Sequence, residues 1–115
     1  MNKLATDLRS ARSALLLADE HAAELADLFR LLGDPTRLRI VLACLDAPTA
    51  VGAIAARLEL SDSLVSHHLR LLRAARVVRA ERHGKQVFYS AADEHIRRVV
   101  MDLLEHAAEP RPEEA

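Results

Sequence analysis

The feature that most limits the possible folds of this chain is a pair of short helical segments joined by only three residues. The periodicity predicts helices over residues 51–58 and 62–73. Two β-type runs follow, over residues 77–80 and 86–90, on either side of a turn at Gly84. Helix, tight turn, helix and hairpin is the element order of the winged helix-turn-helix. We therefore expect a mainly α fold with a small β-hairpin wing.

The remainder of the chain also has a helical pattern. Three glycines and four prolines in 115 residues leave little room for a sandwich or a barrel. We expect a single domain over residues 1–109, followed by a disordered tail over residues 110–115 that contains two prolines and two glutamates. Apolar residues at spacings of three and four predict the remaining helices over residues 3–17, 20–32, 35–46 and 93–108.

Positive charge gathers in one segment, although the net charge of the chain is only −1. Between residues 70 and 85 the chain carries six cationic side chains and one acidic side chain, Glu81. A neutral protein with one basic segment is suited to binding a polyanion. A solvated surface is the alternative interpretation. The six cations are Arg70, Arg73, Arg76, Arg79, Arg82 and Lys85.

Cysteine usage and hydropathy limit the compartment. The single cysteine, Cys44, excludes an internal disulfide and an all-thiolate metal site within one chain. It lies among aliphatic residues, so we expect it in the core. The apolar stretch at residues 15–17 is too short to span a membrane, and no signal peptide is evident. We expect a cytoplasmic protein.

One face of the helix at residues 62–73 has the composition of a DNA-reading surface. Short hydroxyls, an imidazole and a forked guanidinium suit base edges and phosphates in a major groove. An ordinary solvated helix face, capped by Ser61 or Asp62, is the alternative. The opposite face, with Val65, Leu69 and Leu72, is expected to be buried. The polar face, at positions i, i+3, i+4 and i+7, consists of Ser63, Ser66, His67 and Arg70.

The expected wing carries cations of its own. Arg79, Arg82 and Lys85 lie where a hairpin could cross an adjacent minor groove or the phosphate backbone. We expect them to contact phosphate rather than to read bases.

Two imidazoles and two carboxylates near the C-terminus form a candidate metal site. Asp93 and His95 stand at the start of the last helix, and His106 and Glu109 at its end. This donor set suits zinc, with cobalt or nickel as further possibilities. A charged, solvated helix surface is the alternative.

The spacing of these donors argues against a site within one chain. His95 and His106 are eleven residues apart, or roughly 16 Å along a helix at about 1.5 Å per residue. Ligands of one ion lie within about 4 Å of each other. An antiparallel partner helix from a second copy could complete the site, and two-fold symmetry would produce two such sites in a homodimer.

Together these residues resemble the ArsR/SmtB family of metal-sensing repressors over residues 22–109. The resemblance rests on the stretch Phe29-Arg30-Leu31-Leu32-Gly33-Asp34-Pro35-Thr36-Arg37-Leu38-Arg39-Ile40, the segment 61–72 and the wing through Tyr89. The quartet Asp93, His95, His106 and Glu109 is similar to the dimer-interface zinc site of the family's zinc sensors.

The resemblance implies a dimeric repressor of an inverted-repeat DNA operator that is released by metal. It also implies a hydrogen bond from the metal-bound His106 to a backbone carbonyl around residues 73–76. Family members that sense arsenic, cadmium or lead carry cysteines before the recognition helix. The matching residues 49–52 contain no thiol, so a second site is not expected.

Two alternatives come from other functional classes. A zinc hydrolase is disfavoured because four protein ligands would leave no open position on the metal. A winged-helix regulator that does not sense metal would keep the DNA-binding residues and the dimer. We expect double-stranded DNA and a second copy of the chain as partners, and no enzymatic activity, membrane association or small organic substrate.

Overall fold

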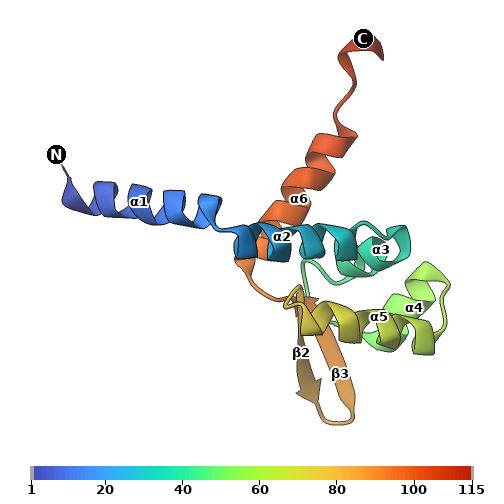
Figure 1. Ribbon diagram of the computed structural model, residues 1–115. Coiled ribbons are helices and arrows are strands. Elements are labelled where there is room, and N and C mark those ends of the chain that lie inside the picture. Colours follow the sequence, from blue (N-terminus) through green and yellow to red (C-terminus); the bar gives the residue numbers. More distant parts are fainter. Residues whose placement is uncertain (1, 115) are drawn as a thin grey trace. The chain divides into compact units, whose positions relative to one another are not determined.

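The computed structural model describes residues 2–114, and its helices and short strands follow the expected order (Figure 1). The chain divides into two compact units, one up to Asp34 and one from Pro35 onward. In chain order the elements are α1 (Lys3–Leu17), α2 (Asp19–Leu32), α3 (Pro35–Ala43), β1 (Thr49–Ala50), α4 (Val51–Leu58), α5 (Asp62–Ala74), β2 (Val78–His83), β3 (Gln86–Ala91), α6 (Glu94–Ala108) and the 3-10 turn η1 (Pro112–Glu114).

The first unit consists of two consecutive helices. Asn2 caps α1 by accepting the backbone N–H of Leu4 on its side-chain oxygen at 3.0 Å. Helix α2 begins with two acidic residues, which favour its positive end, and it ends at Gly33. A Cβ at Gly33 would lie 3.2 Å from the carbonyl oxygen of Phe29, so a glycine suits this close turn. Both helices agree with the ranges expected from the sequence, to within one residue.

The core of the second unit is aliphatic. Ile40 and Val41 of α3 and Ile54 of α4 are fully buried. The sequence pattern predicts Leu38, Val41, Leu42 and Leu45 as inward-facing. Val41 and Leu45 are buried and Leu38 and Leu42 are half-buried, whereas the buried Ile40 was missed. The expected helix over 35–46 ends earlier, at Ala43. Further buried side chains come from α5, β2, β3 and α6, namely Val65, Leu69, Leu72, Val78, Tyr89 and Val100.

The helix-turn-helix is formed by α4, a tight turn and α5. Glu59 ends α4 in the left-handed conformation, with φ of 58°. Leu60 donates its backbone N–H to the carbonyl of Ala55 at 2.9 Å, which closes the turn. Ser61 then caps α5 by accepting the N–H of Leu64 on Oγ at 3.1 Å. Three residues therefore suffice to reverse the chain between the two helices.

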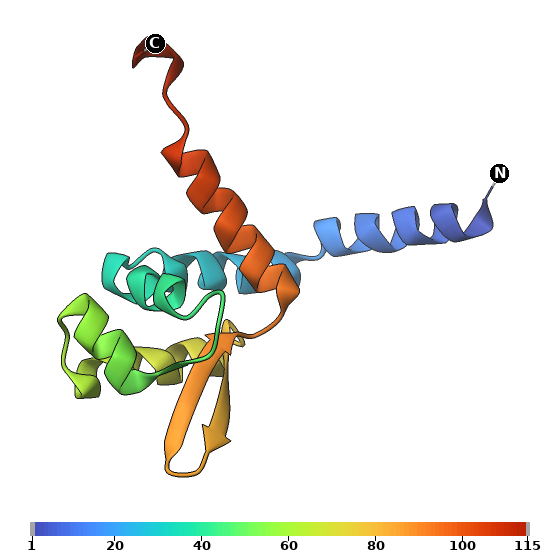
Figure 2. The ribbon, with the colours of Figure 1, turned by 180° about the vertical axis from the view of Figure 1, so that it is seen from behind.

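The wing is the hairpin of β2 and β3, which projects from the second unit in both views (Figures 1 and 2). The strands pair from Val78↔Ala91 to His83↔Gln86. Gly84 takes a φ of +65° in the two-residue turn, a conformation that glycine adopts without strain. A strand that the sequence did not predict, β1, pairs with β3 on its other edge, so the sheet order is β1-β3-β2. Among the described residues, no helix is long and apolar enough to cross a membrane.

Candidate DNA-binding surface and metal half-sites

Helix α5 presents the predicted polar face away from the core. Its buried stripe, Val65, Leu69 and Leu72, is fully inaccessible to solvent, as expected from the sequence. The predicted DNA-reading residues lie on the other side of the helix. Ser63, His67 and Arg70 are exposed, and Ser66 is half-buried. These four side chains therefore form one surface at the outside of the helix-turn-helix.

A polar contact attaches α5 to α3 behind this surface. His68 is half-buried, and its Nδ1 accepts a hydrogen bond from Nε of Arg37 at 3.3 Å. The His68 ring also lies 5.6 Å from the ring of His67. His67 and His68 thus have different environments, because one is exposed on the outer face and the other contacts α3.

The wing cations differ in how far they are held in place. Arg79 donates from Nε to Oγ of Ser90 across the hairpin at 3.2 Å. Arg82 and Lys85 are exposed, and neither side chain makes a hydrogen bond or ion pair with any residue in the described part of the chain. At the tip, His83 pairs with Glu81 at 3.0 Å and packs its ring edgewise on Phe88. The two unpaired cations therefore lie at the tip of the wing, with Lys85 in the turn and Arg82 close to it.

The predicted metal ligands form two separate pairs, one at each end of α6. Nδ1 of His95 lies 3.9 Å from Oδ1 of Asp93, and Nδ1 of His106 lies 3.9 Å from Oε2 of Glu109. The two imidazoles are highly exposed, 98% for His95 and 81% for His106. Within residues 2–114 of one chain, no three histidine, cysteine or acidic side chains are grouped so as to hold a metal. Each pair is thus a candidate half-site with two donors.

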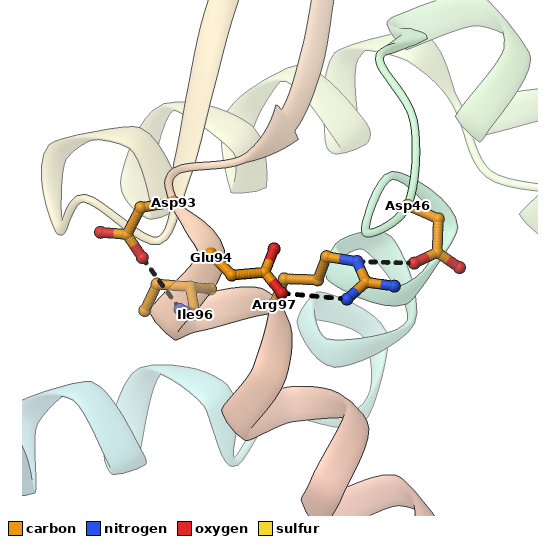
Figure 3. Close-up of polar contacts among 5 residues, drawn as sticks. All are labelled: Asp46, Asp93, Glu94, Ile96 and Arg97. Carbon is orange, nitrogen blue, oxygen red and sulfur yellow. Dashed lines mark hydrogen bonds and ion pairs between the residues drawn. The ribbon is translucent and has the colours of Figure 1, made fainter.

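One candidate ligand, Asp93, is part of the start of α6 (Figure 3). Asp93 caps the helix, because its Oδ1 accepts the backbone N–H of Ile96 at 2.9 Å. One turn further on, Arg97 donates from Nε to Asp46 at 3.1 Å and from Nη1 to Glu94 at 3.3 Å. Sequence analysis did not find Arg97 or Asp46. They are 51 residues apart, and no local pattern connects them.

Cys44 is not positioned as a ligand. It is buried at the end of α3 and donates its thiol to the carbonyl oxygen of Ile40 at 3.4 Å. Burial raises the pKa of the thiol from 9.0 to about 11, because the interior disfavours a thiolate. The expectation that Cys44 is a core residue is confirmed.

Comparison with known proteins shows what the chain is similar to. Residues 34–80 match a family described as "Bacterial regulatory protein, arsR family". The chain is 38% identical over 90 residues to a transcriptional repressor SmtB homolog from Synechocystis sp., which covers 78% of this chain and 68% of the relative. It is 42% identical over 91 residues to the HTH-type transcriptional regulator CmtR of Mycobacterium bovis, covering 79% and 77%.

Among solved structures, the chain is similar to a homodimeric winged helix-turn-helix DNA-binding domain from Mycobacterium bovis, described as a possible ArsR-family regulator. The TM-score is 0.75 and the identity 26%, over 85% of this chain and 94% of the other.

Proposed function

Because the chain belongs to the ArsR/SmtB family of winged-helix transcriptional repressors, we propose that it represses transcription from an inverted-repeat operator and is released by zinc. In this proposal it acts in the cytoplasm as a homodimer, with residues 1–109 as the functional domain and 110–115 as a tail. The observation that carries the metal response is the presence of two exposed half-sites at opposite ends of α6. The chain is a transcription regulator, and this sets aside the zinc-hydrolase alternative.

The outer face of α5 is suited to entering a major groove. Ser63, Ser66, His67 and Arg70 would reach base edges or phosphates, while the core stripe holds the helix to the domain. Arg79, Arg82 and Lys85 of the wing would contact the neighbouring backbone. In a dimer, two such helices would read half-sites about 34 Å apart, one turn of DNA.

The half-sites support a metal site shared between two copies. Each pair holds one imidazole and one carboxylate, and two pairs make the four-ligand set that zinc accepts. Asp93 and His95 of one copy would meet His106 and Glu109 of the other. The ion would supply a charged cross-link between the two copies of α6. Cobalt or nickel accept the same donors and are alternatives.

Dimerisation is supported by the surface of α6 and by a relative. The similar structure from Mycobacterium bovis is homodimeric. Only Val100 of α6 is buried within one chain, whereas Val99, Leu103 and Leu104 are 45–49% exposed. Apolar side chains of this size on one helix are typical of a surface that becomes covered.

The response follows from linkage between the two ligands. If zinc favours a dimer geometry that separates or reorients the α5 helices, DNA affinity falls, and DNA weakens zinc binding by the same factor. The family resemblance adds a route for this effect, a hydrogen bond from His106 to a carbonyl around residues 73–76. An imidazole bound through one nitrogen has its other N–H free to donate.

The test is fluorescence anisotropy of a labelled inverted-repeat duplex, titrated with protein in zinc and in chelator. We expect tight binding in chelator and a loss of affinity of about 5- to 150-fold in zinc, the usual range of such coupling. His106→Ala should bind the duplex equally with and without zinc. If the wild-type protein binds the duplex with the same affinity in zinc and in chelator, the alternative of a regulator that does not sense metal is favoured.

A further inference from the structure

Arg97 connects the start of α6 to a loop far away in the sequence. Its guanidinium bridges Asp46, in the loop between α3 and β1, and Glu94, on the first turn of α6 (Figure 3). The arginine side chain is 42% exposed and that of Asp46 is 69% exposed. Glu94 stands between the two proposed ligands Asp93 and His95. The bridge therefore begins within the first half-site.

Few other contacts fix this end of α6. Two residues separate it from β3, and the backbone N–H of Ala92 donates to the carbonyl of Val77 at 3.0 Å. Along the helix itself only Val100 is buried. Ile96 and Met101 are half-buried. Because only one side chain of α6 is fully packed in this unit, the contact between Arg97 and Asp46 contributes to the angle at which the helix leaves β3.

The other end of the bridge leads toward the recognition helix. Asp46 lies three residues beyond the end of α3, and α3 carries Arg37, whose Nε bonds Nδ1 of His68 in α5. The same loop continues into β1, where Thr49 pairs with Tyr89 of β3. A helix of nine residues thus connects two polar contacts, one to α6 and one to α5.

We propose that Arg97 is a positioning residue that couples the half-site at the start of α6 to helix α5 through Asp46 and α3. This inference rests on the proposed function, since it concerns how occupancy of that half-site reaches the DNA-binding surface. Arg97 binds neither metal nor DNA. It holds Glu94 and Asp46 together, so a change in the orientation of the first turn of α6 displaces the α3–β1 loop.

Removal of Arg97 is expected to weaken the coupling between zinc binding and DNA binding. It is not expected to change the affinity of the protein for either ligand alone. An ion pair exposed to this degree contributes modestly, so Arg97→Gln should fold and dimerise. Its zinc affinity and its zinc-free DNA affinity should stay within about 2-fold of wild type, while the zinc-induced loss of DNA affinity shrinks about 2- to 5-fold. Arg97→Lys should shrink it less, because an ammonium is a point charge that holds one carboxylate better than two.

The experiment compares wild type, Arg97→Gln, Asp46→Asn and the charge-swapped pair Asp46→Arg with Arg97→Asp. Zinc affinity is measured by competition with a chromophoric chelator, and DNA affinity by anisotropy with and without zinc. Arg98→Gln is the matched control, because the Arg98 side chain is exposed and makes no hydrogen bond or ion pair within the described residues. The two single variants should lose coupling to the same extent, and the charge swap should restore part of it.

A readout without metal tests the same contact. Amide hydrogen exchange at Thr49 and Ala50 of apo protein should be faster in Arg97→Gln than in Arg98→Gln, because the loop before β1 loses its attachment. If Arg97→Gln keeps the wild-type coupling factor and exchange rates, the inference is overturned and the proposed function stands. If wild-type DNA binding ignores zinc, the proposed function fails, and this inference fails with it.

Discussion

Asp93 Oδ1 accepts the backbone N–H of Ile96 at 2.9 Å, so the first proposed ligand also caps the helix that carries it. Among the described residues, its second oxygen makes no hydrogen bond. One carboxylate can therefore serve the helix with one oxygen and a metal with the other. Because asparagine caps about as well as aspartate, substitution can separate these two roles.

Asp93→Asn should preserve stability while losing zinc affinity, because the amide oxygen caps α6 but carries no charge. Asp93→Ala should lose both, with a cost in unfolding free energy of about 0.5–2 kcal/mol from the missing cap. Urea unfolding in chelator measures the first quantity and chelator competition the second. If Asp93→Asn binds zinc with wild-type affinity, Asp93 is not a ligand of the metal.

A mixed dimer should bind one zinc ion. One chain would lack Asp93 and His95, and the other would lack His106 and Glu109. In the shared arrangement, one interface site then joins two intact halves and the other joins two broken halves. The heterodimer is separated from both homodimers, and native mass spectrometry then counts its bound zinc ions. A heterodimer that binds no zinc at neutral pH would contradict the shared site.

The recognition helix and the wing should respond differently to substitution. His67→Ala should weaken binding to the operator by about 1–3 kcal/mol with little effect on random DNA, since a base contact carries sequence information. Lys85→Ala should weaken both equally and reduce the salt dependence by about one counterion. Anisotropy with both duplexes over a range of salt measures these effects. Equal losses on the two duplexes for His67→Ala would disprove its role in base reading.

The burial of Cys44 leads us to expect that the folded state becomes less stable at alkaline pH. Because burial raises the pKa of the folded thiol from 9.0 to about 11, the folded state retains a proton that the unfolded state loses between these values. The free energy of unfolding should therefore fall as pH rises from 9 to 11, by up to about 3 kcal/mol from this group. Urea unfolding of wild type and Cys44→Ala over this range isolates the contribution as a difference in slope. Identical slopes would contradict it.

The sequence predicted the elements that have a strong period and missed those that depend on distant partners. The stripe of Val65, Leu69 and Leu72 repeats at helical spacing, and all three side chains are buried. Strand β1 has only two residues, too few to show alternation, and it exists because β3 offers a free edge. The helix expected over 35–46 ends at Ala43, before the apolar pattern does, and Leu45 is buried from the loop that follows.

The candidate site was predictable to the same extent. Ligand types and their spacing are local, so the sequence indicated both pairs and the need for a second chain. The contact between Arg97 and Asp46 joins residues from different elements, and neither residue type nor spacing indicated it.

The eleven steps along the chain from His95 to His106 also set an angle. At about 100° per residue they amount to three full turns and roughly 20° more, so the two imidazoles project from nearly the same side of α6. The intervening side chains can vary without disturbing this alignment. Deletion or insertion of a single residue would swing one histidine by about 100° around the helix. For the proposed shared metal site, the length of α6 between the two histidines is therefore a constraint of its own, separate from the side chains that form the core and the apolar surface of this helix.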